Sequence, residues 1–210
     1  MKSEPEKPLY LLRAFNEREY AEDFIQRGRM RAGRLQVYKR IEDAKRQDAD
    51  EGDGRLKIWG NVPVITLNRE TGEFLSETNQ PGYFNYSVSF INPTYIFCMA
   101  GPQVSVEYLA QKYGKFIVRI DEPQAFVEEI TQYFAESVIW VKLVKVRYDK
   151  DIEVQEPPDN EEGTMLSLAQ KSSDFRDDEE YRLVVSMPGG GGDDYIFVEL
   201  NKKLVYANWL

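Results

Sequence analysis

The order of strand-like and helix-like segments constrains the fold of this chain more than any other feature. Helical periodicity predicts a first helix that Asn16 caps and Gly28 ends, further helices at 103–113, 122–134 and 165–171, and one or two turns at 41–47. Strand-like runs occupy 9–14, 34–38, 56–59, 62–67, 83–90, 94–99, 115–120, 138–148 and the last stretch from residue 180. Because these segments do not alternate as regular βαβ units, the sequence predicts a single α+β domain over 1–210, with a bent antiparallel or mixed sheet and three to four helices.

Four segments have the composition of tails, loops or turns. The polar residues 1–8 are expected to form a tail, and the acidic, proline-bearing residues 149–163 a mobile surface connection. Residues 68–80 are expected to form a hairpin or exposed loop that turns at Thr71-Gly72. The four glycines at 189–192 lack the Lys-Ser/Thr of a phosphate-binding P-loop, so we interpret them as a hairpin tip.

Composition excludes several classes of function. The net charge is −9, from 27 basic and 36 acidic side chains, which argues against a general binder of nucleic acids or of anionic membranes. The chain has no histidine and one cysteine, which excludes Ser-His-Asp and Cys-His catalysis, His-containing zinc sites and thiolate metal clusters. Cys98 lies in an apolar run and is expected to be buried. Without a signal core or a run of about 18 apolar residues, the protein is expected to be cytoplasmic and not to bind membranes.

Charged residues are concentrated between residues 27 and 54. Up to residue 40 they are all basic, and we interpret them either as an anion-binding wall or as surface charges that pair with nearby carboxylates: Arg27, Arg29, Arg31, Arg34, Lys39 and Arg40. The acidic turn that follows does not fit an EF-hand, because Asp53 and Trp59 occupy the positions that require Gly and Glu. No metal is therefore expected. A divalent site of another type is the alternative, with the ligands Glu42, Asp43, Asp48 and Glu51.

Two further charge patterns lie within apolar strands. Strand alternation puts Glu180 and Arg182 on one face, and Asp178 on the same side if the strand begins early enough. An edge strand with charges facing solvent is the commonest arrangement of such a pattern. Arg13 is the one charge in LYLLRA, so it is expected either to pair with Glu180 or Glu42 or to bind an anion.

Three motifs together resemble a family of uncharacterised bacterial proteins. The motifs are R-M-R-A-G-R-L-Q-V-Y-K-R-I-E-D-x-x-R-x-D-x-x-E-G from Arg29, YGKFIVRIDEPQAF at 113–126 and EEYRLVV at 179–185. The resemblance implies a shared fold and a site near the residues that carry it, which are Tyr38, Glu42, Asp43, Arg46, Asp48, Glu51, Gly52, Glu180 and Arg182.

A second resemblance is to ADP-ribosyltransferases of the Arg-Ser-Glu type. That family has an Arg on its first core strand, a Ser-Thr-Ser-like step on a middle strand and a late catalytic Glu that follows another acid by two residues. The matching order here is Arg13, Ser87-Val88-Ser89 and Asp178-x-Glu180, with Val88 and Asp178 departing from the usual residues. The resemblance implies that Arg13 holds NAD, Ser87 orients Arg13 and Glu180, and Glu180 stabilises the ribosyl cation. The further residues expected to bind NAD are Tyr38, Arg34, Ser89 and Arg182.

Three functions are consistent with these patterns. The first is an ADP-ribosyltransferase-like enzyme that uses NAD, such as a bacterial toxin or a phage-defence effector. The second is a metal-dependent phosphodiesterase or nuclease built on the acidic turn. The third is a non-enzymatic module that binds a nucleotide or a protein. The expected partners are a nucleotide or small-molecule ligand and a protein or nucleic-acid target. An open cleft shared by Arg13, Tyr38, Glu42 and Glu180 would favour chemistry or ligand binding, and a closed, buried network would favour a structural role.

Overall fold

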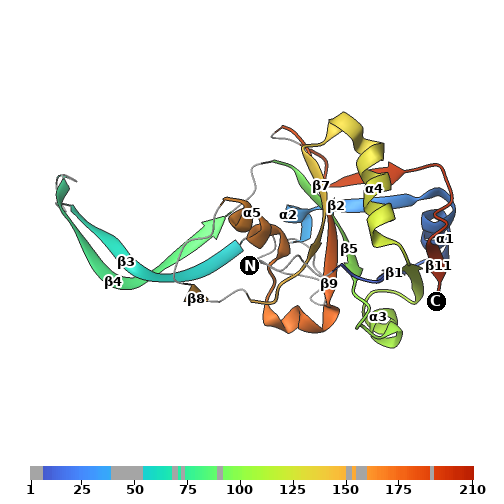
Figure 1. Ribbon diagram of the computed structural model, residues 1–210, viewed down its shortest axis with the longest axis horizontal. Helices are drawn as coiled ribbons and strands as arrows, with labels where there is room; N and C mark the ends of the chain where they lie inside the picture. The colour runs from blue at the N-terminus through green and yellow to red at the C-terminus, as the bar shows by residue number, and fades with distance from the viewer. Residues whose placement is uncertain are drawn as a thin grey trace.

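The fold combines helices with antiparallel sheet, as the sequence predicts for an α+β protein. The computed structural model describes residues 7–38, 54–67, 71, 74–88, 92–149, 153–154, 160–189 and 192–210. Figure 1 shows a large sheet with helices packed against it and two long strands that project from it as an arm. None of the helices within the described ranges is long and apolar enough to span a membrane.

The large sheet contains eight strands, and all of its pairs are antiparallel. Six of them follow the order β10-β2-β5-β1-β6-β11, while β9 lies between β5 and β7. The strands are β1 (Leu11–Phe15), β2 (Arg29–Arg34), β5 (Thr94–Ala100), β6 (Phe116–Ile120), β7 (Trp140–Lys145), β9 (Glu180–Ser186), β10 (Tyr195–Glu199) and β11 (Ala207–Trp209).

The sheet branches at β5. One edge of β5 pairs along its whole length with β9, from Thr94↔Ser186 to Ala100↔Glu180. The other edge is shared, because β2 pairs at Tyr95 and Ile96 and β1 pairs at Ala100. Thus β2 pairs with the first half of this edge and β1 with its last residue. The stretch of β5 between these two pairings is left for a side chain to contact.

One face of this sheet packs against α1 (Arg18–Arg27) and α4 (Pro123–Phe134). Phe24 is central to this core, with its ring centroid 5.8 Å from that of Phe97 and 5.9 Å from that of Phe126. Gly28 ends α1 with φ 61°, a left-handed conformation that favours glycine, as predicted. The predicted cap at Asn16 is wrong, since Glu17 is the N-cap residue and makes no side-chain cap bond.

The other helices differ more from the sequence-based expectation. The stretch 34–38 was expected to be a strand, but β2 ends at Arg34 and a short helix follows, because Leu35 is buried in a second core cluster with Ile96, Val184 and Leu168. The helix expected at 165–171 begins at residue 160, and the expected connection 149–163 contains β8 and the start of that helix. The remaining elements are α2 (Leu35–Tyr38), α3 (Val106–Lys112), η1 (Ala135–Ser137), α5 (Asn160–Ala169) and η2 (Ser173–Asp178).

The arm consists of β3 (Gly54–Leu67) and β4 (Phe74–Val88), which pair over fourteen residue pairs. The short strand β8 (Glu153–Val154) pairs with β3 in parallel at Lys57 and Ile58, near the base of the arm. The hairpin alternative with its turn at Thr71 is confirmed, but the short strands expected on either side are two continuous strands. A two-stranded ribbon tolerates Pro63 and Pro81 inside its strands, because both strands have an outer edge to which a proline nitrogen can point.

Candidate functional site

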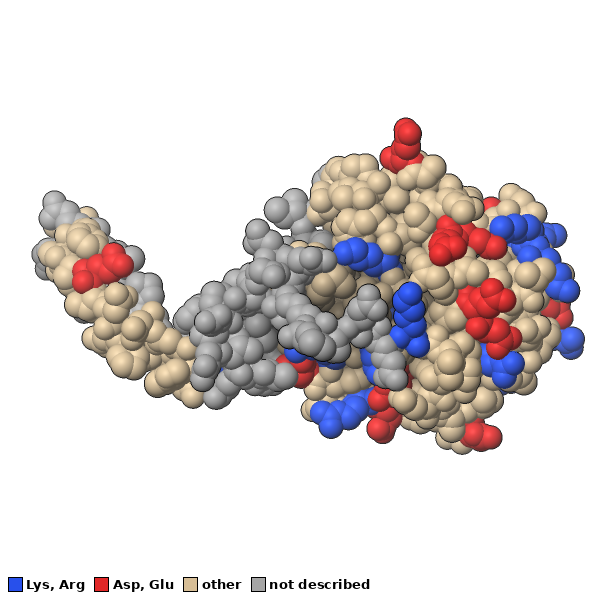
Figure 2. Space-filling view, viewed as in Figure 1, with Lys and Arg blue, Asp and Glu red and all other residues tan. Residues whose placement is uncertain are grey.

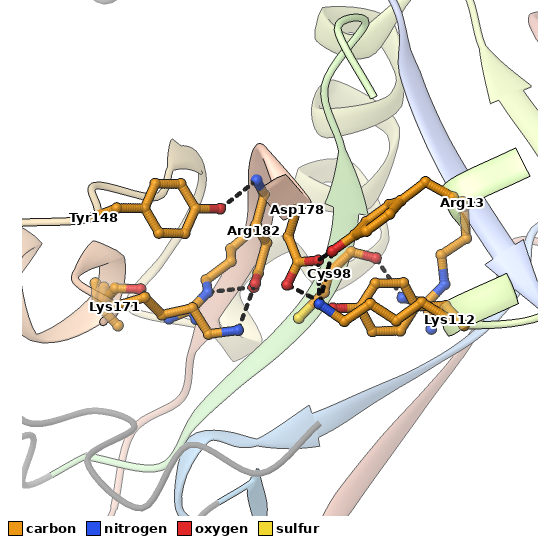
Figure 3. Close-up of polar contacts among 11 residues, drawn as sticks. Arg13, Cys98, Lys112, Tyr148, Lys171, Asp178 and Arg182 are labelled. Carbon is orange, nitrogen blue, oxygen red and sulfur yellow. Dashed lines mark hydrogen bonds and ion pairs between the residues drawn. The ribbon is translucent and has the colours of Figure 1, made fainter. Parts of the chain in front are cut away.

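The most buried charges of the described chain surround β9. Glu180 is 6% exposed and Arg182 0% exposed, although an edge strand with exposed charges was expected. That expectation is wrong because β7 pairs with the edge of β9 that faces away from β5. Arg182 Nε donates to Glu180 Oε1 over 2.7 Å, and Lys171 Nζ donates to Glu180 Oε2 over 2.8 Å (Figure 3). Both oxygens of the Glu180 carboxylate are therefore occupied.

Two further bonds complete the surroundings of Glu180 and Arg182. Arg182 Nη1 donates over 2.6 Å to the carbonyl of Leu168, in the last turn of α5, where a helix has carbonyls without an intrahelical donor. The Tyr148 hydroxyl accepts from the backbone N–H of Glu180 over 2.8 Å. Burial alone would raise the pKa of Glu180, but the charges of Arg182 and Lys171 hold that pKa well below its usual range. Glu180 is therefore ionised and paired in the folded protein.

Asp178 is the centre of a second cluster, two residues before Glu180. Its Oδ1 accepts from Lys112 Nζ over 2.7 Å and from the Tyr108 hydroxyl over 2.8 Å, and its Oδ2 accepts from the Tyr113 hydroxyl over 2.6 Å. Asp178 is 3% exposed. Burial and the bond to Asp178 raise the pKa of Tyr113. Burial acts to lower the pKa of Lys112, but the bonds to Asp178 and Tyr108 raise it overall. We call Lys112, Lys171, Asp178, Glu180 and Arg182 the ion network.

Arg13 occupies the gap between β1 and β2. Its Nη1 donates to the carbonyl of Cys98 in the middle of β5, and its guanidinium lies 4.5 Å from the ring centroid of Phe97 and 5.7 Å from that of Phe15. A carbonyl and two aromatic faces both stabilise a guanidinium cation, and Glu42, the other partner predicted for Arg13, lies outside the described residues. The expected pairing of Arg13 with Glu180 is therefore replaced by these contacts, because Lys171 and Arg182 already occupy that carboxylate.

Tyr38 packs against the second core cluster, which includes Leu35 and Val184. Burial raises the pKa of the Tyr38 phenol, and the charged forms of Cys98, Arg13, Glu180 and Arg182 all act on it. A Cβ atom at Gly33 would lie 3.0 Å from the Tyr38 ring, so a larger residue there would require the ring to shift. The structure thus brings Arg13, Tyr38, Asp178, Glu180 and Arg182 into one region. Figure 3 labels Arg13, Asp178 and Arg182 among them. Cys98 lies partly buried in this region, and burial raises the pKa of its thiol.

Of the other candidate residues, the structure describes Ser87 and Arg34. Ser87 belongs to β4, where its backbone pairs with Arg55 in the second sheet, whereas Arg13 and Glu180 belong to the first sheet. Arg34, at the end of β2, donates to the carbonyl of Gly192 over 3.3 Å. The predicted metal ligands and one predicted NAD contact lie outside the described residues: Glu42, Asp43, Asp48, Glu51 and Ser89. Within the described ranges no three metal-ligating side chains form a group, so the divalent site stays a prediction about the acidic turn.

The four described basic residues between 27 and 40 all contact groups of this chain. Arg29 Nη1 lies 3.2 Å from a carboxylate oxygen of Asp23, and Arg27 Nε lies 3.9 Å from the other. The guanidinium of Arg31 lies 4.5 Å from the ring centroid of Tyr195. The contacts of Arg27 and Arg29 agree with the interpretation in which these charges pair with nearby carboxylates, whereas Arg31 contacts an aromatic ring. Lys39 and Arg40 lie outside the described residues.

Sequence reasoning missed Lys112, Lys171, Tyr108 and Tyr113. Tyr108 and Lys112 are four residues apart and so share a face of α3, which is a local signal for a contact between them. Nothing local indicates Asp178, which follows Lys112 by 66 residues. The network is therefore a product of tertiary structure and carries no short motif.

No family model, no curated protein and no solved structure matches this chain. The site is therefore interpreted from its own geometry. For Glu180 to act as a base or to stabilise a cation on a substrate, its carboxylate would have to leave Lys171 or Arg182, and a buried ion pair loses much free energy when one partner is removed. The arrangement is well suited to holding β9 between its neighbours.

Proposed function

We propose that this chain is a non-enzymatic, protein-binding module whose β3–β4 arm contacts the partner. The observation that carries the proposal is the length and exposure of the arm, which extends away from the large sheet in Figure 1. Every residue from 74 to 81 is exposed. Because an isolated two-stranded ribbon is marginally stable in water, an arm of this length gains stability when another surface covers it.

The described side chains of the arm include large apolar groups that face solvent. Trp59 is 46% exposed and Tyr83 54% exposed, and their rings meet edge to face with centroids 4.6 Å apart. Phe74 and Leu75, at the far end of the arm, are 61% and 57% exposed. Aromatic anchors of this kind are enriched where proteins bind each other.

The charge of the arm favours a protein over a nucleic acid as the partner. Residues 54–88 hold three basic and three acidic side chains, so the whole net charge of −9 lies outside the arm. Figure 2 agrees, since the described part of the arm is largely uncharged while charged side chains are scattered over the rest of the molecule. A surface with balanced charge neutralises few phosphates, and phosphate contacts dominate the affinity for nucleic acids.

Photo-cross-linking tests this function. A photoreactive amino acid at Phe74 is expected to cross-link the chain to a discrete protein in cells that produce it, because Phe74 lies at the exposed end of the arm. The matched control is the same amino acid at Tyr20, which is also 61% exposed but lies on α1. The product should disappear when Trp59 and Tyr83 are both replaced by Ser. Equal labelling from Phe74 and Tyr20 would overturn the proposal.

An ADP-ribosyltransferase-like activity is the second candidate. One observation favours it: Ala100 on β5 pairs with Leu12 of β1 and with Glu180 of β9, so the strand that carries Arg13 and the start of β9 flank the same end of β5. The activity further requires that Ser87 or another hydroxyl reach this region and that Glu180 exchange an ion-pair partner for the substrate. Incubation with labelled NAD tests it, with transfer and nicotinamide release as readouts and Arg13→Lys and Glu180→Gln as variants. Absence of both products from the wild type would exclude it.

A further inference from the structure

One face of the arm is defined by its backbone register. Residues directly opposite each other in an antiparallel pair lie on the same face, as do every second residues along each strand. Lys57, Trp59 and Asn61 on β3 therefore share a face with Tyr83 and Glu77 on β4, and we call these five residues the Trp59 face. The contact between the Trp59 and Tyr83 rings agrees with this register, and all five residues are exposed.

The edges of the arm are less suited to binding than this face. Pro63 pairs with Asn79, and Pro81 pairs with Asn61. Antiparallel residue pairs alternate between those that are hydrogen-bonded to each other and those whose backbone N–H and C=O groups point to the outer edges. A proline has no N–H to donate, so both of these pairs are of the second kind. Each outer edge is therefore interrupted by a proline near its middle, and such an interruption opposes the addition of another strand. A partner is expected to pack on a face of the ribbon.

The charges of the Trp59 face are arranged symmetrically about Asn61. Lys57 precedes Asn61 by four residues toward the base of the arm. Glu77 pairs with Ile65, four residues beyond Asn61 toward the far end. At a rise of about 3.4 Å per residue, Lys57 and Glu77 each lie about 14 Å along the arm from Asn61. The positive charge lies on the side of the base and the negative charge on the side of the far end. A surface with this pattern is complementary to a copy of itself turned end for end.

We propose that a second copy of this chain packs on the Trp59 face, with the two arms antiparallel about a two-fold axis at Asn61. The inference rests on the proposed protein-binding function and names its partner. In this arrangement Lys57 of each copy lies opposite Glu77 of the other, and the aromatic pair of each copy lies at the level of Asn79 of the other. The contact is self-complementary, as a two-fold interface requires.

The distribution of net charge supports the same arrangement. The two copies carry their negative charge outside their arms, so the antiparallel arrangement keeps the charged parts at opposite ends of the paired arms. An arm of fourteen residue pairs is about 45 Å long, several times the Debye length of about 8 Å at physiological salt. The charged parts therefore repel each other little. A ribbon about 10 Å wide and 45 Å long would bury roughly 900 Å² over both copies, which is the size of a weak, reversible dimer.

Charge reversal with rescue tests the pairing of Lys57 with Glu77. The wild type is expected to sediment as a reversible monomer–dimer mixture. Lys57→Glu and Glu77→Lys should each weaken the dimer about tenfold, because each places two like-charged pairs across the axis. The double variant should recover most of the wild-type affinity, since opposite charges again face each other. Lys203→Glu makes the same change of charge at an exposed site outside the arm, and it should leave the dimer unchanged.

Cysteine cross-linking tests the position of the axis. Asn61→Cys is expected to be joined to its own copy by a bismaleimide cross-linker about 10 Å long, because residues on a two-fold axis face themselves and stacked sheets lie about 10 Å apart. Thr66→Cys, also exposed on the arm but away from the axis, should react much less, and the wild type with Cys98 alone gives the background. A monomeric wild type, a double variant that is not rescued, or equal reaction of Thr66→Cys would overturn the inference. If the protein is monomeric but still cross-links to another protein through Phe74, the partner is not a second copy of this chain. The proposed protein-binding function would then stand.

Discussion

The strand β9 and the β3–β4 arm place their side chains in opposite ways. β9 holds a glutamate and an arginine inside the protein, whereas the arm holds Trp59 and Tyr83 in solvent. Burial of charge is tolerated at β9 because each oxygen of Glu180 accepts a bond from a cation. The arm has no such internal compensation for its aromatic surface. We therefore propose that β9 serves the stability of the single chain, whereas the arm serves the contacts proposed above.

The largest expected effect tests the stability half of this comparison. Arg182→Met should lower the free energy of unfolding by about 3–5 kcal/mol, because it leaves Glu180 Oε1 and the Leu168 carbonyl buried without that donor. Urea titration measures the change. Lys202→Met is the control, since it removes a cation 3.0 Å from Glu129 that is about half exposed, and such pairs contribute about 0–1 kcal/mol. Equal losses in the two variants would mean that the network does not stabilise β9.

A smaller loss is expected at the second carboxylate of the network. Asp178→Asn should cost about 1–3 kcal/mol, because an amide cannot accept from Lys112, Tyr108 and Tyr113 as a carboxylate does. Asp177→Asn is the neighbouring control, and its side chain is exposed. Unfolding of both variants in urea gives the comparison. A loss from Asp177→Asn as large as that from Asp178→Asn would assign the effect to the local turn.

The ion pairs of Glu180 also predict a dependence of stability on pH. The pKa of Glu180 is lower in the folded protein than its unperturbed value of 4.5, so its contribution is complete above that pH and is lost as the pH falls toward the folded value. The difference in unfolding free energy between wild type and Glu180→Gln should therefore be constant near neutral pH and shrink below pH 4.5. A difference that stays constant down to acid pH would contradict the pairing.

The smallest effect on stability is expected in the arm. Trp59→Ser should change the free energy of unfolding by less than about 1.5 kcal/mol, since it removes one cross-strand aromatic contact. The same substitution should reduce cross-linking from Phe74 and sedimentation as a dimer. Tyr133→Ser removes an aromatic group with 45% exposure from α4 and should affect neither measurement. Loss of overall stability above that range would show that the arm supports the fold of the chain.

Elements with strong local signals were predictable. Pro123 at the start of α4, the apolar spacing through Phe134 and Gly28 after α1 all carry a local physical reason, and the structure has each of them. The arm was not predictable as a unit, because Gly60, Pro63 and the Pro81-Gly82 step indicate strand ends when the chain is read locally. They occur here inside two strands of a ribbon, where a proline nitrogen can point to an outer edge.

The candidate site was predictable only in part. Alternation correctly put Glu180 and Arg182 on one face, but it could not show that β7 covers β9, since that depends on pairing between distant segments. No sequence pattern indicated that Lys112 contacts Asp178 or that Lys171 contacts Glu180, because these contacts depend on how α3 and the end of α5 pack. The ADP-ribosyltransferase-like activity stays a prediction that the NAD incubation tests, and the metal site of the acidic turn also stays a prediction.

The branching of the sheet at β5 has a consequence for how the chain folds. The pairing of β5 with β9 is its most extensive one, and it cannot form until β9 has been synthesised. Ala100 pairs with Glu180, eighty positions later in the chain. Closing so long a loop delays folding, since its entropy is lost before the contacts form. During synthesis the apolar strand β5 therefore waits with one open edge until most of the chain has left the ribosome. We expect chains that stop before residue 180 to aggregate or to depend on chaperones, whereas the complete chain closes that edge with its own charged strand.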